Sequence, residues 1–105
     1  MIRLSVIYPN KDNGQFDFDY YMATHMPLVA TLYAEYGLKS WQVDKGTSMS
    51  SKMPSEFVAA CYMDFDSMDS LKQAMKNKGG EVMADLKNFT DIEPAVSFGE
   101  LLGQC

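Results

Sequence analysis

The stretch Glu56-Phe57-Val58-Ala59-Ala60-Cys61-Tyr62-Met63-Asp64-Phe65 decides the fold, because it is the strongest predicted strand in the chain. Alternate side chains of a strand point to opposite faces. One face therefore carries Phe57, Ala59, Cys61, Met63 and Phe65. The other face carries Val58, Ala60 and Tyr62. Both faces are apolar, so we expect this strand to be covered on both sides, with Cys61 as a small core residue.

The remaining predicted elements place this strand third in a sheet. In chain order they are a strand over 2–8, a helix from Phe18, a second helical piece over 28–36, a strand over 38–45, a helix after Asp66 or Ser67, a short helix over 81–88 and a strand over 94–101. Gly79-Gly80 is expected to end the long helix. The order βαββαβ predicts a single α+β ferredoxin-like domain over residues 1–105, with a four-stranded antiparallel sheet and its helices on one face.

The first helix has clear start and stop signals. Asp17 suits its N-cap, which starts the helix at Phe18. Pro27 has no N–H to donate to the carbonyl of Ala23, and it disfavours helical geometry at Met26. We therefore expect the helix to break or kink at Pro27.

The second face of the strand over 56–65 is apolar, and no predicted element of the chain is expected to bury it. Ile7 adds an apolar side chain to the same face of the sheet. Two sheets packed about a two-fold axis would bury both faces, so we predict a homodimer that closes into an α/β barrel. The alternative is a monomer in which loops fold over the central strand.

Charge and composition exclude several classes of partner. Fourteen acidic and nine basic residues give a net charge of −5, and the lysines are scattered, so nucleic acid is not an expected partner. No apolar run reaches the ~20 residues of a membrane span, and no secretion signal is evident, which favours the cytoplasm. One histidine with dispersed carboxylates makes a poor metal site, and no glycine-rich phosphate loop is present. We therefore expect no metal and no cofactor.

The residues around the only histidine, together with the order βαββαβ, resemble the pattern of a known family. The chain resembles the EthD family, which is named for ethyl tert-butyl ether degradation, over nearly its whole length. The matching motifs are Phe16-Asp17-x-Asp19-x-Tyr21, Tyr21-x-x-x-His25-x-Pro27-Leu28, Gly37-Leu38, Phe65-Asp66-Ser67 and Phe89-Thr90-Asp91-Ile92-x-Pro94. The resemblance implies a dimeric α/β barrel, a small-molecule cavity between helices and sheet, and chemistry without metal or flavin on aromatic or polyketide-like compounds.

Tyr21 and His25 are the candidate catalytic residues. If residues 18–26 are helical, the spacing of four places both side chains on one face. The ordinary pKa of histidine, about 6.5, lets His25 gain and lose a proton near neutrality. We hypothesise that His25 removes a proton from a phenol or enol and that Tyr21 hydrogen-bonds the oxyanion. The competing interpretation is a hydrogen-bonded packing histidine.

Four aromatic residues are candidates for substrate binding, namely Tyr20, Trp41, Phe57 and Tyr62. Successive helical residues point about 100° apart, so only one of Tyr20 and Tyr21 should face the cavity of His25, and we favour Tyr21. The other three either line an aromatic pocket or belong to the core.

Two functions fit these observations. The first is a cofactor-independent oxygenase or isomerase that acts on a small, partly apolar compound in a catabolic or secondary-metabolic pathway. The second is a non-catalytic accessory protein that binds a pathway intermediate for a separate oxygenase.

Overall fold

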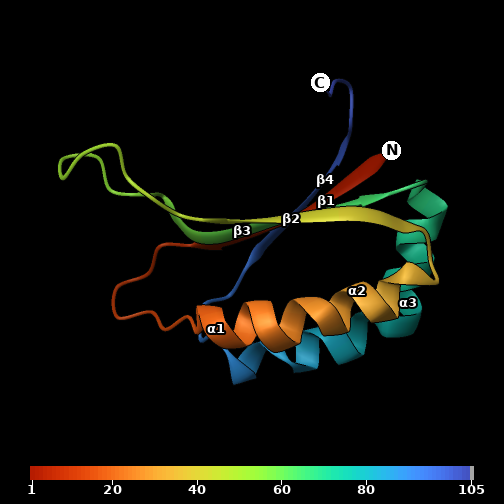
Figure 1. Cartoon of the computed structure of the whole chain (residues 1–105), viewed down its shortest axis with the longest axis horizontal. Coiled ribbons are helices and arrows are strands. Elements are labelled where there is room, and N and C mark those ends of the chain that lie inside the picture. The colour runs from red at the N-terminus through yellow and green to blue at the C-terminus, as the bar shows by residue number, and fades with distance from the viewer. Residues whose placement is uncertain (105) are drawn as a thin grey trace.

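A computed structural model of the chain, in which residues 1–104 are described, has the predicted order of elements. Its strands are β1 (Ile2–Pro9), β2 (Leu38–Lys45), β3 (Phe57–Phe65) and β4 (Ala95–Glu100). They form one antiparallel sheet in the order β2-β3-β1-β4. All the helices lie on one side of this sheet (Figure 1). The predicted α+β ferredoxin-like fold is confirmed, and no helix of residues 1–104 is long and apolar enough to cross a membrane.

Strand β3 is central, as its apolar pattern predicted. Cys61 lies opposite Val6 of β1 and Val43 of β2. The side chains of β3 that face the helices are buried from Ala59 to Phe65. Cys61 is a core residue, and burial raises the pKa of its thiol to about 11.

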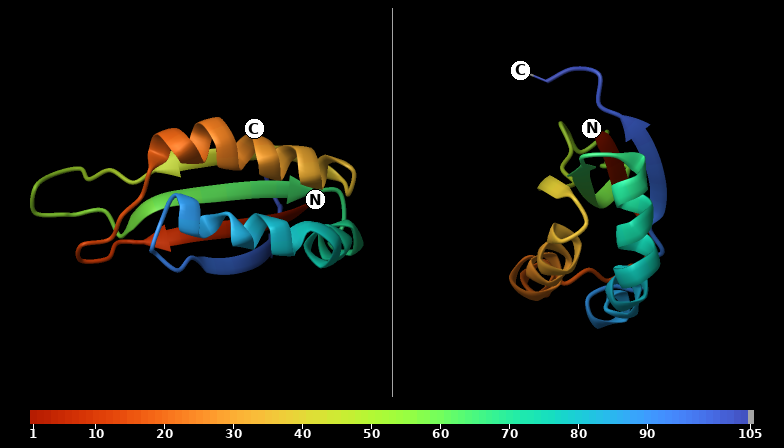
Figure 2. Two further views of the ribbon diagram at one scale, coloured as in Figure 1. Left: turned by 90° about the horizontal axis from the view of Figure 1, so that it is seen from below. Right: turned by 90° about the vertical axis from the view of Figure 1, so that its right-hand side faces the viewer.

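The other face of the sheet carries no helix, as the right-hand view of Figure 2 shows. On this face Asp64 is buried and accepts two hydrogen bonds from the Arg3 guanidinium, at 2.8 Å and 2.9 Å. The guanidinium lies 5.5 Å from the centre of the Tyr62 ring. The hydrogen bonds from Arg3 lower the pKa of Asp64, so the carboxylate stays charged. The homodimer expected to cover this face stays a prediction.

The first helical segment continues through Pro27, so the predicted break is wrong. It consists of α1 (Phe18–Tyr20), a π-helical turn η1 (Tyr21–His25) and α2 (Met26–Ala34). Asp17 caps it as predicted, since its Oδ1 accepts a hydrogen bond from the Tyr20 N–H at 3.0 Å. Met26 keeps helical geometry, with φ −65° and ψ −40°, and its N–H bonds the Tyr21 carbonyl five residues back. Pro27 therefore falls in the first turn of α2, where a missing N–H costs little.

The long helix α3 (Met68–Ala84) also continues where the sequence predicted an end. Ser67 caps it, accepting a hydrogen bond from the Ser70 N–H at 3.1 Å. Gly79 and Gly80 are both helical, because packing of the following turn, including buried Val82, outweighs their weak helix propensity. The predicted short helix is reduced to a 3-10 turn, η2 (Leu86–Asn88).

Replacing Gly80 with alanine should raise the free energy of unfolding by about 0.5–1 kcal/mol, because glycine weakens a helix interior. Apart from the adjacent residues and the backbone of its own helix, the added Cβ would have no atom within 4 Å. Urea denaturation measures the change. Gly37→Ala is the matched control and should destabilise, because Gly37 has φ +90° and a Cβ there would lie 2.6 Å from Asp66 Oδ1. A fall in stability for Gly80→Ala would contradict this account of the helix.

Candidate functional site

A cavity of about 230 Å³ lies between the sheet and the helices. Its lining is largely apolar. The sheet and the segment before β4 contribute Leu4, Val6, Tyr8, Cys61, Met63, Pro94 and Val96, and the helical segments contribute Tyr21, His25, Met26, Val29, Tyr33, Met75, Gly79, Val82, Met83 and Leu86. Apolar pockets with a few polar groups are the usual form of small-molecule sites.

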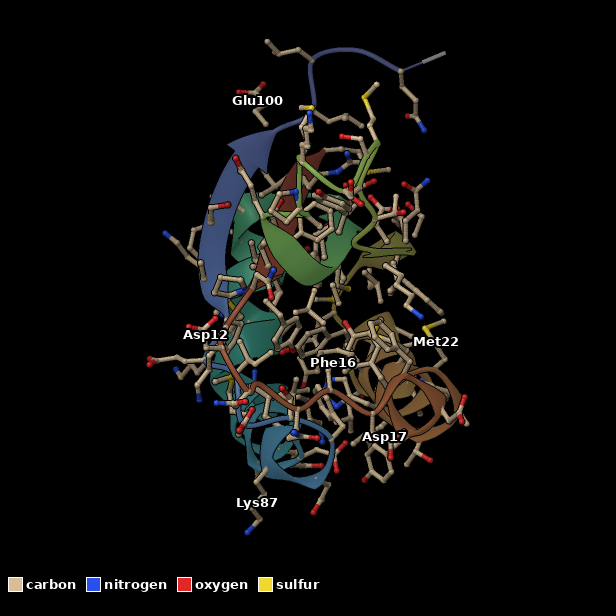
Figure 3. All side chains as sticks on the ribbon, turned by 90° about the vertical axis from the view of Figure 1, so that its left-hand side faces the viewer. Asp12, Phe16, Asp17, Met22, Lys87 and Glu100 are labelled. Atoms are coloured by element: carbon tan, nitrogen blue, oxygen red, sulfur yellow. The ribbon has the colours of Figure 1, made fainter. Side chains whose placement is uncertain are left out.

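One end of the cavity is closed by a cluster of aromatic rings. Phe16 lies between the sheet and the first helix (Figure 3). Its ring centre lies 5.1 Å from that of Tyr8, 5.0 Å from Tyr21 and 5.3 Å from Phe89. The His25 ring packs 4.5 Å from Phe89 in the same cluster. The histidine is therefore fixed among rigid side chains at this end.

The imidazole of His25 is held by the carboxylate of Asp85, which directly follows α3. His25 Nδ1 lies 2.9 Å from Asp85 Oδ2, and only 4% and 12% of the two side chains are exposed. The second oxygen, Asp85 Oδ1, accepts hydrogen bonds from the Tyr20 hydroxyl at 2.7 Å and from Asn88 Nδ2 at 2.9 Å. Asp85 is thus satisfied by donors on both oxygens.

Burial sets the protonation of this pair. Burial lowers the pKa of His25 below its ordinary value and outweighs the opposing effect of Asp85. Burial raises the pKa of Asp85, but hydrogen bonds from Asn88, Tyr20 and His25 together bring it below its ordinary value. At neutral pH the imidazole is neutral and the carboxylate is ionised. The hydrogen-bond network then assigns the ring proton to Nδ1, which donates to Asp85.

The second nitrogen of the ring, Nε2, has no protein partner within residues 1–104. No fully buried side-chain nitrogen or oxygen of these residues lacks a hydrogen-bond partner. Nε2 is therefore not fully buried, and His25 is one of the residues that line the cavity. Its lone pair is available as a proton acceptor.

Tyr21 lies beside the imidazole and stays protonated. The two rings are stacked, with centres 5.4 Å apart and planes 19° apart. Burial raises the pKa of Tyr21 far above its ordinary value, with a smaller contribution from the nearby thiol of Cys61. The phenol is a hydrogen-bond donor and not a base at any ordinary pH. Tyr21 and His25 therefore offer a donor and an acceptor to one cavity.

The other aromatic residues singled out in the sequence lie elsewhere. Tyr20 binds Asp85 and does not line the cavity. Trp41 is half-buried on β2 and packs against the core, and Phe57 is half-buried at the start of β3. Tyr62 lies on the opposite face of the sheet, near Arg3. The lining of the cavity includes none of these four.

Asp85 is the site residue that sequence reasoning missed. It lies 60 positions after His25, so local spacing could not join the two. The sequence contains one weak indication that Asp85 faces the core. Val82, Asp85 and Phe89 have helical spacing, and the other two are apolar. An acidic residue on the buried face of a predicted helix needs a partner.

Stability should fall as the pH drops from 7 to 5. The unfolded imidazole binds a proton near its ordinary pKa of 6.5, whereas the folded one, whose pKa is lowered, resists it. The free energy of unfolding then decreases by at most about 1.4 kcal/mol per pH unit. Below pH ~4 protonation of Asp85 adds a loss of the same sign. Urea midpoints measured at each pH test this, with His25→Gln as the control.

In His25→Gln the slope between pH 7 and 5 should be flatter, because His25 is the only histidine. A wild-type stability that instead rises over this interval would mean that Asp85, and not burial, controls the pKa of the imidazole.

Within residues 1–104, no group of three or more histidine, cysteine, aspartate or glutamate side chains is placed to hold a metal ion.

Comparison with known proteins points to one family. A family model described as EthD domain matches residues 14–93. The solved structure of an EthD-like protein from Ralstonia eutropha JMP134 matches with a TM-score of 0.91 and 33% identity, over 99% of this chain and 94% of that chain. An EthD family protein from Bacillus halodurans C-125 matches with a TM-score of 0.74 and 28% identity, over 97% and 99%.

A more distant structure supports the fold alone. It is a dimeric ferredoxin-like protein from an uncultured marine organism, with a TM-score of 0.64 and 10% identity over 99% of this chain and 96% of that chain. A comparison with curated proteins finds no match.

Proposed function

Because the chain belongs to the EthD family, we propose that it binds a small, largely apolar molecule in its cavity and that His25 accepts a proton from this molecule. The observation that carries the proposal is the pair His25–Asp85. His25 Nδ1 lies 2.9 Å from the largely buried Asp85 carboxylate, Nε2 has no hydrogen-bond partner within residues 1–104, and His25 lines the apolar cavity. A fully buried packing histidine would have both nitrogens hydrogen-bonded.

The character of the cavity limits the ligand. Its volume of about 230 Å³ lies just below the ~300–1,000 Å³ of drug-sized pockets, so the ligand is small. Burial of a charge in such surroundings is costly unless it is paired. The ligand should therefore enter neutral, with one weakly acidic O–H or C–H, as in a phenol or an enolisable ketone.

The proposed chemical step is a proton transfer. The ligand's proton passes to His25 Nε2, and the resulting imidazolium is stabilised by the Asp85 carboxylate on Nδ1. The negative charge left on the ligand oxygen accepts a hydrogen bond from the Tyr21 hydroxyl. Both partners stand ready in the required form, since His25 is neutral and Tyr21 is protonated.

Two reactions can follow from the deprotonated ligand. In an isomerisation the proton returns to a different atom, and no other reactant is needed. In a cofactor-independent oxygenation the ligand reduces dioxygen, so that a CH₂ group becomes a carbonyl and the second oxygen atom leaves as water. An accessory protein would bind the same ligand and stop before either step.

A test with 2-tetralone, a two-ring enolisable ketone, separates these outcomes. NMR in deuterated buffer should show faster exchange of its acidic C–H protons with the wild-type protein than with His25→Gln, although both should bind it. An oxygen electrode then distinguishes oxygenation from isomerisation. Equal exchange by the two proteins would refute the role of His25 as a base, and binding without exchange would assign the accessory function.

A further inference from the structure

We propose that the cavity receives an elongated ligand with its acidic group first, and that Gly79 keeps open the part of the cavity that holds the ligand's apolar tail. This inference rests on the proposed function, because it takes His25 as the contact for the acidic group. It makes Gly79 a specificity-determining residue, and the ligand class becomes a phenol or enol that carries an alkyl-like tail.

The cavity is extended along two helices. Helices α2 and α3 run in opposite directions beneath the sheet (Figure 2). Along α3, Gly79 and Met75 lie six and ten residues before Asp85, or about 9 Å and 15 Å at 1.5 Å per residue. Along α2, Tyr33 lies eight residues after His25, or about 12 Å. Since all of these except Asp85 line the cavity, its lining extends over about 12–15 Å along the helices.

The two ends of this space differ in polarity. His25, Tyr21 and Tyr8 lie at the end beside Asp85. The other end is lined by Val29, Met63, Met75 and Gly79, together with Tyr33, whose ring packs 5.7 Å from Phe65. Although Tyr33 carries a hydroxyl, only the end with His25 offers an imidazole, so a ligand with one acidic end and one apolar end is expected to place its acidic end there.

The cavity opens between α3 and β4. The lining residues of β3, η1 and α2 are buried, whereas Met75, Met83 and Val96 are 40%, 57% and 45% exposed. The mouth is thus apolar, and two of its side chains are methionines, which adapt to ligands of different shape. A tail that extends beyond the polar end would contact this mouth.

Gly79 has no backbone reason to be glycine. It lies inside α3 with a negative φ, and a Cβ there would meet its nearest neighbour, Met75 Cβ, at an ordinary 3.9 Å. The fold would therefore accept a side chain at position 79. The only effect of glycine there is to leave space unfilled. That space belongs to the cavity. The adjacent Gly80 is exposed and does not line the cavity, so it supplies a matched control.

Calorimetric titration with 4-alkylphenols, from 4-methylphenol to 4-hexylphenol, tests the inference on the wild type, Gly79→Leu and Gly80→Leu. Wild-type affinity should rise about fourfold for each added methylene that is buried. Gly79→Leu should bind 4-methylphenol as the wild type does but lose at least about tenfold in affinity for the longer phenols, which corresponds to about two buried methylenes. Gly80→Leu should match the wild type throughout. Thermal melting should show both variants folded, at or above the wild-type midpoint.

The possible failures can be told apart. If the wild type binds these phenols without any dependence on tail length, or if the two leucine variants bind alike, the inference is refuted while the proposed function stands. If the wild type binds none of the phenols, the proposed function and the inference fail together. A uniform loss of affinity in His25→Gln across the series would support the acidic-end contact on which both depend.

Discussion

Asp85→Asn will lower the rate of proton transfer by about 10²–10⁴-fold, because it removes the free base from the cavity. The carbonyl oxygen of the introduced amide should take the position of Oδ1, where Tyr20 and Asn88 donate. Its NH₂ group then faces His25 Nδ1, which must become an acceptor. The ring proton moves to Nε2, and the nitrogen that faces the ligand can no longer accept a proton.

The tautomer can be observed without any substrate. His25 is the only histidine, so the ¹⁵N spectrum of its ring shows a single pair of signals. The wild type should carry the proton on Nδ1 and Asp85→Asn on Nε2. Tyr20→Phe is the control, because it removes one donor to Asp85 but keeps the carboxylate, and it should leave the tautomer and most of the rate unchanged. An Asp85→Asn protein with an Nδ1 proton and wild-type exchange would rule out a positioning role for Asp85.

Phe65→Ala will destabilise the domain by about 3–5 kcal/mol, the usual cost of removing a buried phenylalanine. The Phe65 side chain is fully buried, and it packs against Tyr33 of α2 at a ring distance of 5.7 Å. Its backbone lies between Ile2 of β1 and Leu38 of β2. Since small domains are stable by only about 5–15 kcal/mol, this one substitution removes a large share of the total.

Urea denaturation with circular dichroism measures this loss. Phe65→Leu keeps most of the side-chain volume and should cost less than about 1.5 kcal/mol. The difference between the two variants reports the cavity left by alanine. Equal stabilities for both variants would show that the end of β3 is not part of the cooperative core.

The strands could be predicted because their pattern of apolar side chains is local in the sequence and agrees with the burial in the folded domain. The alternation in β3 and the turn formers around it specify a central strand before any contact is known. Pro27 and Gly79 were misjudged for the opposite reason. Each is a local helix breaker in isolation, but Pro27 falls where its N–H is not needed, and α3 gains enough from packing to continue through Gly79.

The site was only half visible in the sequence for a related reason. Tyr21 and His25 are four residues apart, so helical geometry alone brings them together. Asp85 reaches His25 only because α3 folds back beside α2, and that pairing depends on the whole sheet. The cavity is likewise formed by residues from both ends of the chain, so no sequence window contains its shape.

The π-helical turn η1 joins the two rings of the site to the buried face of α2 in one continuous helix. A π-helical turn amounts to an α-helix with one inserted residue. Downstream of it, Met26, Val29 and Tyr33 keep ordinary helical spacing on the buried face. Tyr21 and His25 continue that face upstream, and each lies four residues before the next buried position of the series 21, 25, 29 and 33. The three residues between them, 22–24, are exposed. Deleting one of them would leave Tyr21 three positions before the histidine, a spacing that still places both side chains on one face of a regular helix. The placing of the two rings on one face therefore does not depend on the inserted residue.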